Sequence, residues 1–156
     1  KISFKQINKM KNLILIIALA ISTSAFSQDT FFLVNKVSYC YFNNDLNDWG
    51  EWIEGSVSNM NSNLVIMGES FDTFLIPTVN RGNVLIKLTE VKDEVEQFSS
   101  FGATYTVKGL EPIAVDVVVK DTGEGEAVLF IEGGNLSIAF EIEYHSKKHG
   151  VIQEIY

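Results

Sequence analysis

The fold class is indicated most directly by the stretch LSIAFEIEY at positions 136–144. Its large apolar residues recur at every second position, namely Leu136, Ile138, Phe140, Ile142 and Tyr144. Because successive side chains of a β-strand point to opposite faces, this alternation predicts a strand with one apolar and one mostly hydrated face. The preceding Gly-Gly-Asn at 133–135 is typical of a tight turn, and an apolar run leads into it. Residues 126–144 are therefore predicted to form a hairpin.

The same period of two continues through the rest of the chain. Further strands are predicted at 31–42, 83–91 and 113–119, and shorter ones at 50–57, 63–68, 71–77, 101–108 and 150–156. The segment 121–125 is predicted as a turn, and 93–97 as a charged loop or a single helical turn. The expected fold is all-β: a single antiparallel barrel or sandwich of about eight to ten short strands.

The N-terminal region has the three parts of a secretory signal peptide. A basic start at Met10-Lys11 is followed by an apolar run at 13–21 and by small residues up to Gln28. This run is shorter than the roughly 20 residues needed to cross a bilayer. We therefore expect an upstream extension at 1–9, a signal peptide helix at 10–28 and one β domain at 29–156. The mature protein is expected to be secreted or periplasmic, with membrane contact only through the signal peptide before cleavage.

Composition narrows the classes of partner. The 156 residues include 12 Lys and Arg against 20 Asp and Glu, a formal net charge of −8. Nucleic acid is excluded as an expected partner, because its binding needs a cationic face that releases phosphate counterions. The single cysteine, Cys40, leaves no internal disulfide and no cysteine-rich zinc site, and it is expected to be a small buried or edge residue.

The most distinctive segment is NNDLNDWGEW at 43–52, which supplies four candidate ligand-binding residues: Asp45, Asp48, Trp49 and Trp52. Its oxygen ligands surround a glycine, as in a calcium loop, but Trp49 and Ser56 occupy positions where an EF-hand needs ligands. Exposed tryptophans also form stacking platforms for sugars or apolar ligands. The alternatives are a polar loop between two strands and tryptophans buried in the core.

Groups able to carry catalysis are few. Asp-Thr-Gly at 121–123 matches an aspartic-protease signature. The same residues are common in β-hairpin turns, and the acidic residues that follow them indicate a hydrated turn. His145 and His149 are four residues apart, with two lysines between them that repel a cation. Asp116 lies in an apolar run and, if buried, needs a partner such as Arg81 or a tyrosine hydroxyl. No catalytic residue, no metal ligand and no cofactor is predicted.

The chain resembles small exported β proteins of Bacteroidota-type bacteria that have no assigned function. The likeness rests on the exit at Gln28, the tryptophan-bearing loop at 43–52, the Ala-Val-Asp strand at 114–116 with Asp-Thr-Gly after it, and the closing strand at 140–144. The resemblance implies a compact β fold outside the cytoplasm and implies no activity.

The predicted function is a non-catalytic exported module that binds or interacts with an unknown protein or small ligand. One alternative is a lipocalin-like carrier of a small apolar ligand. Another is a small metal-dependent hydrolase, which requires Asp116, Asp121, His145 and His149 to converge in one pocket. An interaction through strand addition requires an exposed edge strand.

Overall fold

The computed structural model describes residues 28–60, 62–80, 82–148 and 151–152. The predicted upstream extension, and the predicted signal peptide up to residue 27, lie outside the described residues. Within the described part, no helix is long and apolar enough to cross a membrane.

Ten strands and one short 3-10 helix follow one another along the described chain. They are β1 (Asp29–Asn43), β2 (Asp48–Trp49), β3 (Ile53–Glu54), η1 (Val57–Asn59), β4 (Leu64–Met67), β5 (Thr73–Thr78), β6 (Gly82–Val95), β7 (Phe98–Val107), β8 (Ile113–Gly123), β9 (Glu126–Gly133) and β10 (Leu136–Lys148). The predicted hairpin at 126–144 is confirmed as β9 and β10, which turn at 134–135.

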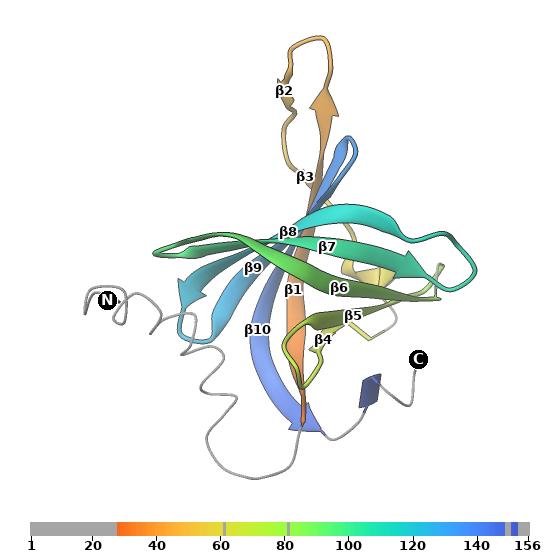
Figure 1. The fold of residues 1–156 in the computed structure, drawn as a ribbon, viewed down its shortest axis with the longest axis vertical. Coiled ribbons are helices and arrows are strands. Elements are labelled where there is room, and N and C mark those ends of the chain that lie inside the picture. Colours follow the sequence, from red (N-terminus) through yellow and green to blue (C-terminus); the bar gives the residue numbers. More distant parts are fainter. Residues whose placement is uncertain (1–27, 61, 81, 149–150, 153–156) are drawn as a thin grey trace.

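Eight of these strands close into an antiparallel barrel (Figure 1). From β4 to β10 each strand pairs with the next along the chain, and β1 pairs with both β4 and β10. The short strands β2 and β3 pair with β1 outside this circuit. The all-β prediction is thus confirmed, and of its two architectures the chain adopts the barrel. Because β1 closes the circuit, none of the eight barrel strands in the described part of the chain is an open edge strand of the kind that strand addition requires.

The barrel strands alternate inward and outward side chains, and the inward apolar ones form the core. Val84 and Ile86 in β6, Val115 and Val117 in β8, and Phe140 in β10 all belong to one buried core. The first strand directs Phe32, Val34 and Val37 toward the interior, and an irregularity of register lies between Val34 and Lys36. A second irregularity lies between Phe31, which is on the outer face, and Phe32. A β-bulge bends the strand and changes the direction in which the following side chains point. A long strand can therefore follow the curved wall of a barrel and still direct these side chains inward.

Three local predictions are wrong. The segment 93–97 is not a loop or a helical turn, because β6 runs to Val95 and pairs with β7 directly across a turn at 96–97. Within 50–57 only Ile53 and Glu54 form a strand. Within 150–156 the two described residues, Val151 and Ile152, are helical.

Those two C-terminal residues cover an apolar patch on the outside of the barrel. Val151 and Ile152 pack against the cluster of Phe31, Ile66 and Leu75. The Ile152 backbone N–H donates a hydrogen bond of 2.8 Å to Oδ2 of the buried Asp29. The contact fixes the end of β10 to the beginning of β1, where the barrel closes.

Candidate functional site

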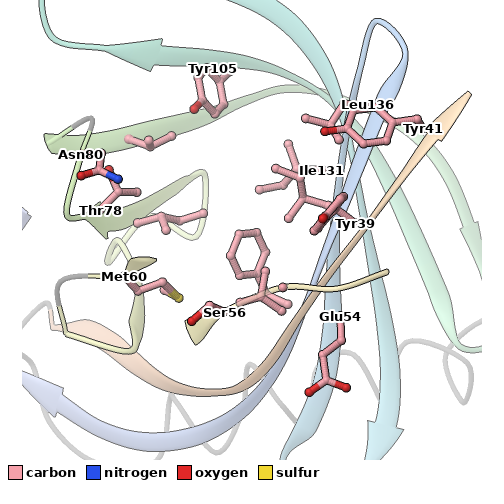
Figure 2. A pocket seen from close by; sticks show the side chains of 16 residues that line it. Tyr39, Tyr41, Glu54, Ser56, Met60, Thr78, Asn80, Tyr105, Ile131 and Leu136 are labelled. Carbon is pink, nitrogen blue, oxygen red and sulfur yellow. The ribbon is translucent and has the colours of Figure 1, made fainter. Parts of the chain in front are cut away.

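A cavity of about 560 Å³ lies inside one end of the barrel (Figure 2). Its lining comes from β1, β3, β5, β6, β7, β9 and β10 together with the segment after β3. The lining residues are Val37, Tyr39, Tyr41, Glu54, Gly55, Ser56, Met60, Ile76, Thr78, Asn80, Val84, Tyr105, Ile131, Leu136, Ile138 and Phe140. At the other end the interior is better filled, and the cavity there is only about 70 Å³.

One wall of the large cavity is the seam where the barrel closes. Tyr39 in β1 lies opposite Ile138 in β10, and Tyr41 lies opposite Leu136. Because the two strands are in register, every second residue of each faces the cavity. Val37, Tyr39 and Tyr41 therefore share one side of β1, and that side is part of the cavity wall.

Another part of the lining is formed by the segment from Gly55 to Met60, which runs from β1 to β5. The Gly55 N–H donates a 2.8 Å hydrogen bond to the Val37 carbonyl, and Met60 forms a β-bridge with Thr78. A side chain at position 55 would put its Cβ 3.3 Å from that same carbonyl oxygen. Glycine therefore lets this segment approach β1 closely and narrow the space above the core.

Apart from Glu54, the polar groups of the lining are uncharged, and they lie toward solvent. Tyr41 is 54% exposed and Asn80 is exposed, whereas Ile76, Val84 and Phe140 are buried. The rings of Tyr39 and Tyr41 meet edge to face, with centroids 5.8 Å apart. In Figure 2 the hydroxyls of these two tyrosines point toward the middle of the cavity.

No lysine, arginine or histidine is among the described residues that line this cavity. The single carboxylate of the lining, that of Glu54, points away from the cavity in Figure 2. Its Oε2 lies 3.7 Å from Nζ of Lys36, whose Nζ is also 4.0 Å from Glu141. The space that a ligand would fill therefore contains hydrogen-bonding groups without a net charge.

The four residues predicted to bind a ligand all lie outside this cavity. Trp49 is 38% exposed and packs edge to face on Phe42, with ring centroids 5.5 Å apart. Trp52 is 48% exposed and packs in the same way on Phe130, at 5.9 Å. Both tryptophans are thus surface residues supported by one aromatic neighbour each, and neither is part of the core.

The polar loop around Asp45 and Asp48 satisfies its own backbone. Oδ1 of Asn43 accepts hydrogen bonds from the N–H groups of Asp45 at 3.0 Å and Leu46 at 3.3 Å. Oδ1 of Asp48 accepts one from the Trp49 N–H at 2.8 Å. Within the described residues, no three His, Cys, Asp or Glu side chains gather as a metal site would require. A ligand-binding role for Asp45, Asp48, Trp49 and Trp52 stays a prediction.

Trp49 does border a second, shallower hollow of about 280 Å³ on the outside of the barrel. The other residues around it are Ala114, Val115, Asp116, Glu132, Gly133 and Gly134. Its two carboxylates already have partners, because Asp116 forms an ion pair with Lys92 and Glu132 accepts a 3.3 Å hydrogen bond from Ser137 Oγ.

The residues required for a hydrolase are not brought together. Asp116 faces outward and is half-exposed, and its carboxylate forms an ion pair with Lys92, whereas Arg81 lies outside the described residues. Asp121 closes a turn by accepting a 2.8 Å hydrogen bond from the Gly123 N–H. The two residues lie five positions apart along β8, which places their backbones about 16 Å apart. His145 lies beyond the end of β9 on β10, and His149 lies outside the described residues.

Cys40 is buried on β1 beside Ser137 of β10, as expected for a small buried residue. Burial raises the pKa of its thiol above the ordinary value of 9.0, and the negative charge of Glu132 adds to this shift. A thiol of this kind is inert toward nucleophilic chemistry, since the thiolate is the reactive form.

The polar residues of the cavity, Tyr39, Tyr105 and Asn80, were not among the residues predicted to bind a ligand. One signal was present: tyrosines occupy inward positions where a filled core usually has aliphatic residues. Comparison with protein-family models, with curated proteins and with solved structures found no match to the chain.

Proposed function

We propose that the protein is an exported, non-catalytic binding protein that takes a small, largely apolar molecule into the open end of its barrel, as a lipocalin-like carrier does. The observation that supports this most strongly is the cavity of about 560 Å³ inside the barrel. Its size falls within the range of roughly 300–1,000 Å³ typical of small-molecule sites.

The character of the lining supports the same proposal. The deep residues Ile76, Val84, Ile131 and Phe140 are buried and apolar. An apolar ligand seated on them loses contact with water, which contributes about 25 cal/mol for each Å² of apolar surface removed. The few polar groups near the opening are of the kind that fix a ligand's orientation.

A fluorescence titration tests this function. The probe is N-phenyl-1-naphthylamine, an uncharged compound whose emission rises in apolar surroundings. The wild-type protein is expected to bind it saturably, and Ile138→Trp, which fills the cavity, to weaken binding at least about tenfold. The matched control is Val95→Trp, because Val95 is 59% exposed and lies next to the β6–β7 turn, away from the cavity. This variant is expected to leave binding unchanged.

Circular dichroism establishes that each variant is folded. If Ile138→Trp does not fold, Leu136→Trp places the same ring nearer the opening of the cavity. The proposal is wrong if the wild-type protein does not bind the probe, or if a folded cavity-filled variant binds it as tightly as the wild type.

A further inference from the structure

We infer that the cavity selects an uncharged amphiphile, a molecule with an apolar body and a neutral hydroxyl, carbonyl or amide group, over carboxylates and amines of the same length. This inference rests on the proposed function and specifies its ligand class.

The lining of the cavity changes from apolar at depth to polar near solvent. The apolar lining residues Met60, Ile131 and Phe140 are buried, whereas Tyr39 and Tyr105 are half-buried and Tyr41 and Asn80 are exposed. A ligand is therefore offered apolar contacts at depth and polar contacts toward solvent. This arrangement matches a molecule whose polar group lies at one end.

The polar side chains of the lining can form hydrogen bonds with a ligand. The side chains of Tyr39, Tyr41, Tyr105 and Asn80 have no hydrogen bond to any residue that the structure describes. A phenol can both donate and accept, and an amide carries donors and an acceptor. A neutral hydroxyl or carbonyl group can be matched by these side chains without any change in the barrel.

Among the described residues that line the cavity, no charged group is placed to pair with a charged ligand. A carboxylate that enters gives up hydration, and the described lining holds no cation to compensate it. An ammonium group is no better placed, because the carboxylate of Glu54 points away and is paired with Lys36. The formal charge of −8 on the whole chain disfavours anions further. Only an uncharged head group avoids an uncompensated desolvation cost.

The test is displacement of N-phenyl-1-naphthylamine by three ten-carbon compounds at about pH 8, where decanoate is anionic, decylamine is cationic and decan-1-ol is neutral. Decan-1-ol is expected to displace the probe at a concentration at least about tenfold lower than either charged compound. The double variant Tyr39→Phe with Tyr105→Phe is expected to weaken decan-1-ol severalfold while leaving the probe bound.

Tyr144→Phe is the matched control, because this tyrosine is exposed on β10 and is not part of the cavity lining. Equal or tighter binding of decanoate or decylamine overturns the inference and leaves the proposed function intact. So does unchanged binding of decan-1-ol by the double variant. Failure of the probe itself to bind overturns the proposed function.

Discussion

At the scale of single residues, Gly133 is a position at which a neighbouring strand leaves no room for a side chain. A Cβ added there would lie 2.9 Å from Cγ1 of Val115, a buried core residue of β8. Real Cβ atoms do not approach this closely, so either the side chain or the backbone must move.

Gly133→Ala is therefore expected to lower the free energy of unfolding by about 1–3 kcal/mol, the usual cost of overpacking. Urea denaturation measures this change. In a Val115→Ala background the clash disappears, so the same substitution at Gly133 is expected to cost clearly less. Equal costs in the two backgrounds would show that the contact with Val115 is not the cause.

At the same scale, the buried thiol of Cys40 is expected to make the stability of the protein depend on pH. Its pKa in the folded protein is raised above 9.0, so above that pH the folded state binds more protons than the unfolded state. The corresponding stabilisation is complete below pH 9.0 and is lost as the pH rises through the folded pKa.

Denaturation as a function of pH measures this effect. Between pH 9.0 and the folded pKa, the wild type is expected to lose stability relative to Cys40→Ala. Native Cys40 is also expected to react with a thiol reagent at least about tenfold more slowly than the urea-unfolded chain. Parallel pH profiles for the two proteins, or equal labelling rates, would contradict the burial of this thiol.

At the scale of elements, β10 was predictable and the β6–β7 turn was not. The alternation at 136–144 follows directly from a wall with a buried and an outer face. The residues around Asp93 extend beyond the barrel and are exposed on both sides. Without a buried face the period of two disappears, and the charged sequence resembles a loop although it is paired in a hairpin.

The C-terminal residues Val151 and Ile152 are expected to stabilise the barrel from outside. Ile152 covers Phe31, Ile66 and Leu75 on the outside of the barrel, and replacing it with serine exposes that patch. We expect Ile152→Ser to lower the free energy of unfolding by about 1–2 kcal/mol.

The control for this prediction is Leu46→Ser, at a residue that is 75% exposed in the β1–β2 loop. This variant is expected to stay within about 0.5 kcal/mol of the wild type. Equal stability of the two variants would mean that the C-terminal segment does not support the barrel.

At the scale of the whole molecule, the sequence predicted a β fold but not its hollow interior. Ile131, Ile138 and Phe140 line the cavity, and in the sequence they are indistinguishable from residues of a filled core. Whether space remains between them depends on how closely opposite walls approach, which alternation along one strand does not report. The tryptophan loop was more conspicuous in sequence, yet it projects from the end of the barrel (Figure 1).

The most direct test of the central claim, that a small neutral ligand occupies the interior of the barrel, is methyl-detected NMR during a titration with decan-1-ol. We expect saturable shifts for the methyl groups of Ile76, Ile131 and Ile138, which line the cavity. The methyl groups of Ile66 and Leu75, on the outer face, are expected to remain unchanged. Shifts confined to the outer-face methyl groups, or no saturable shift in any methyl group, would contradict the account.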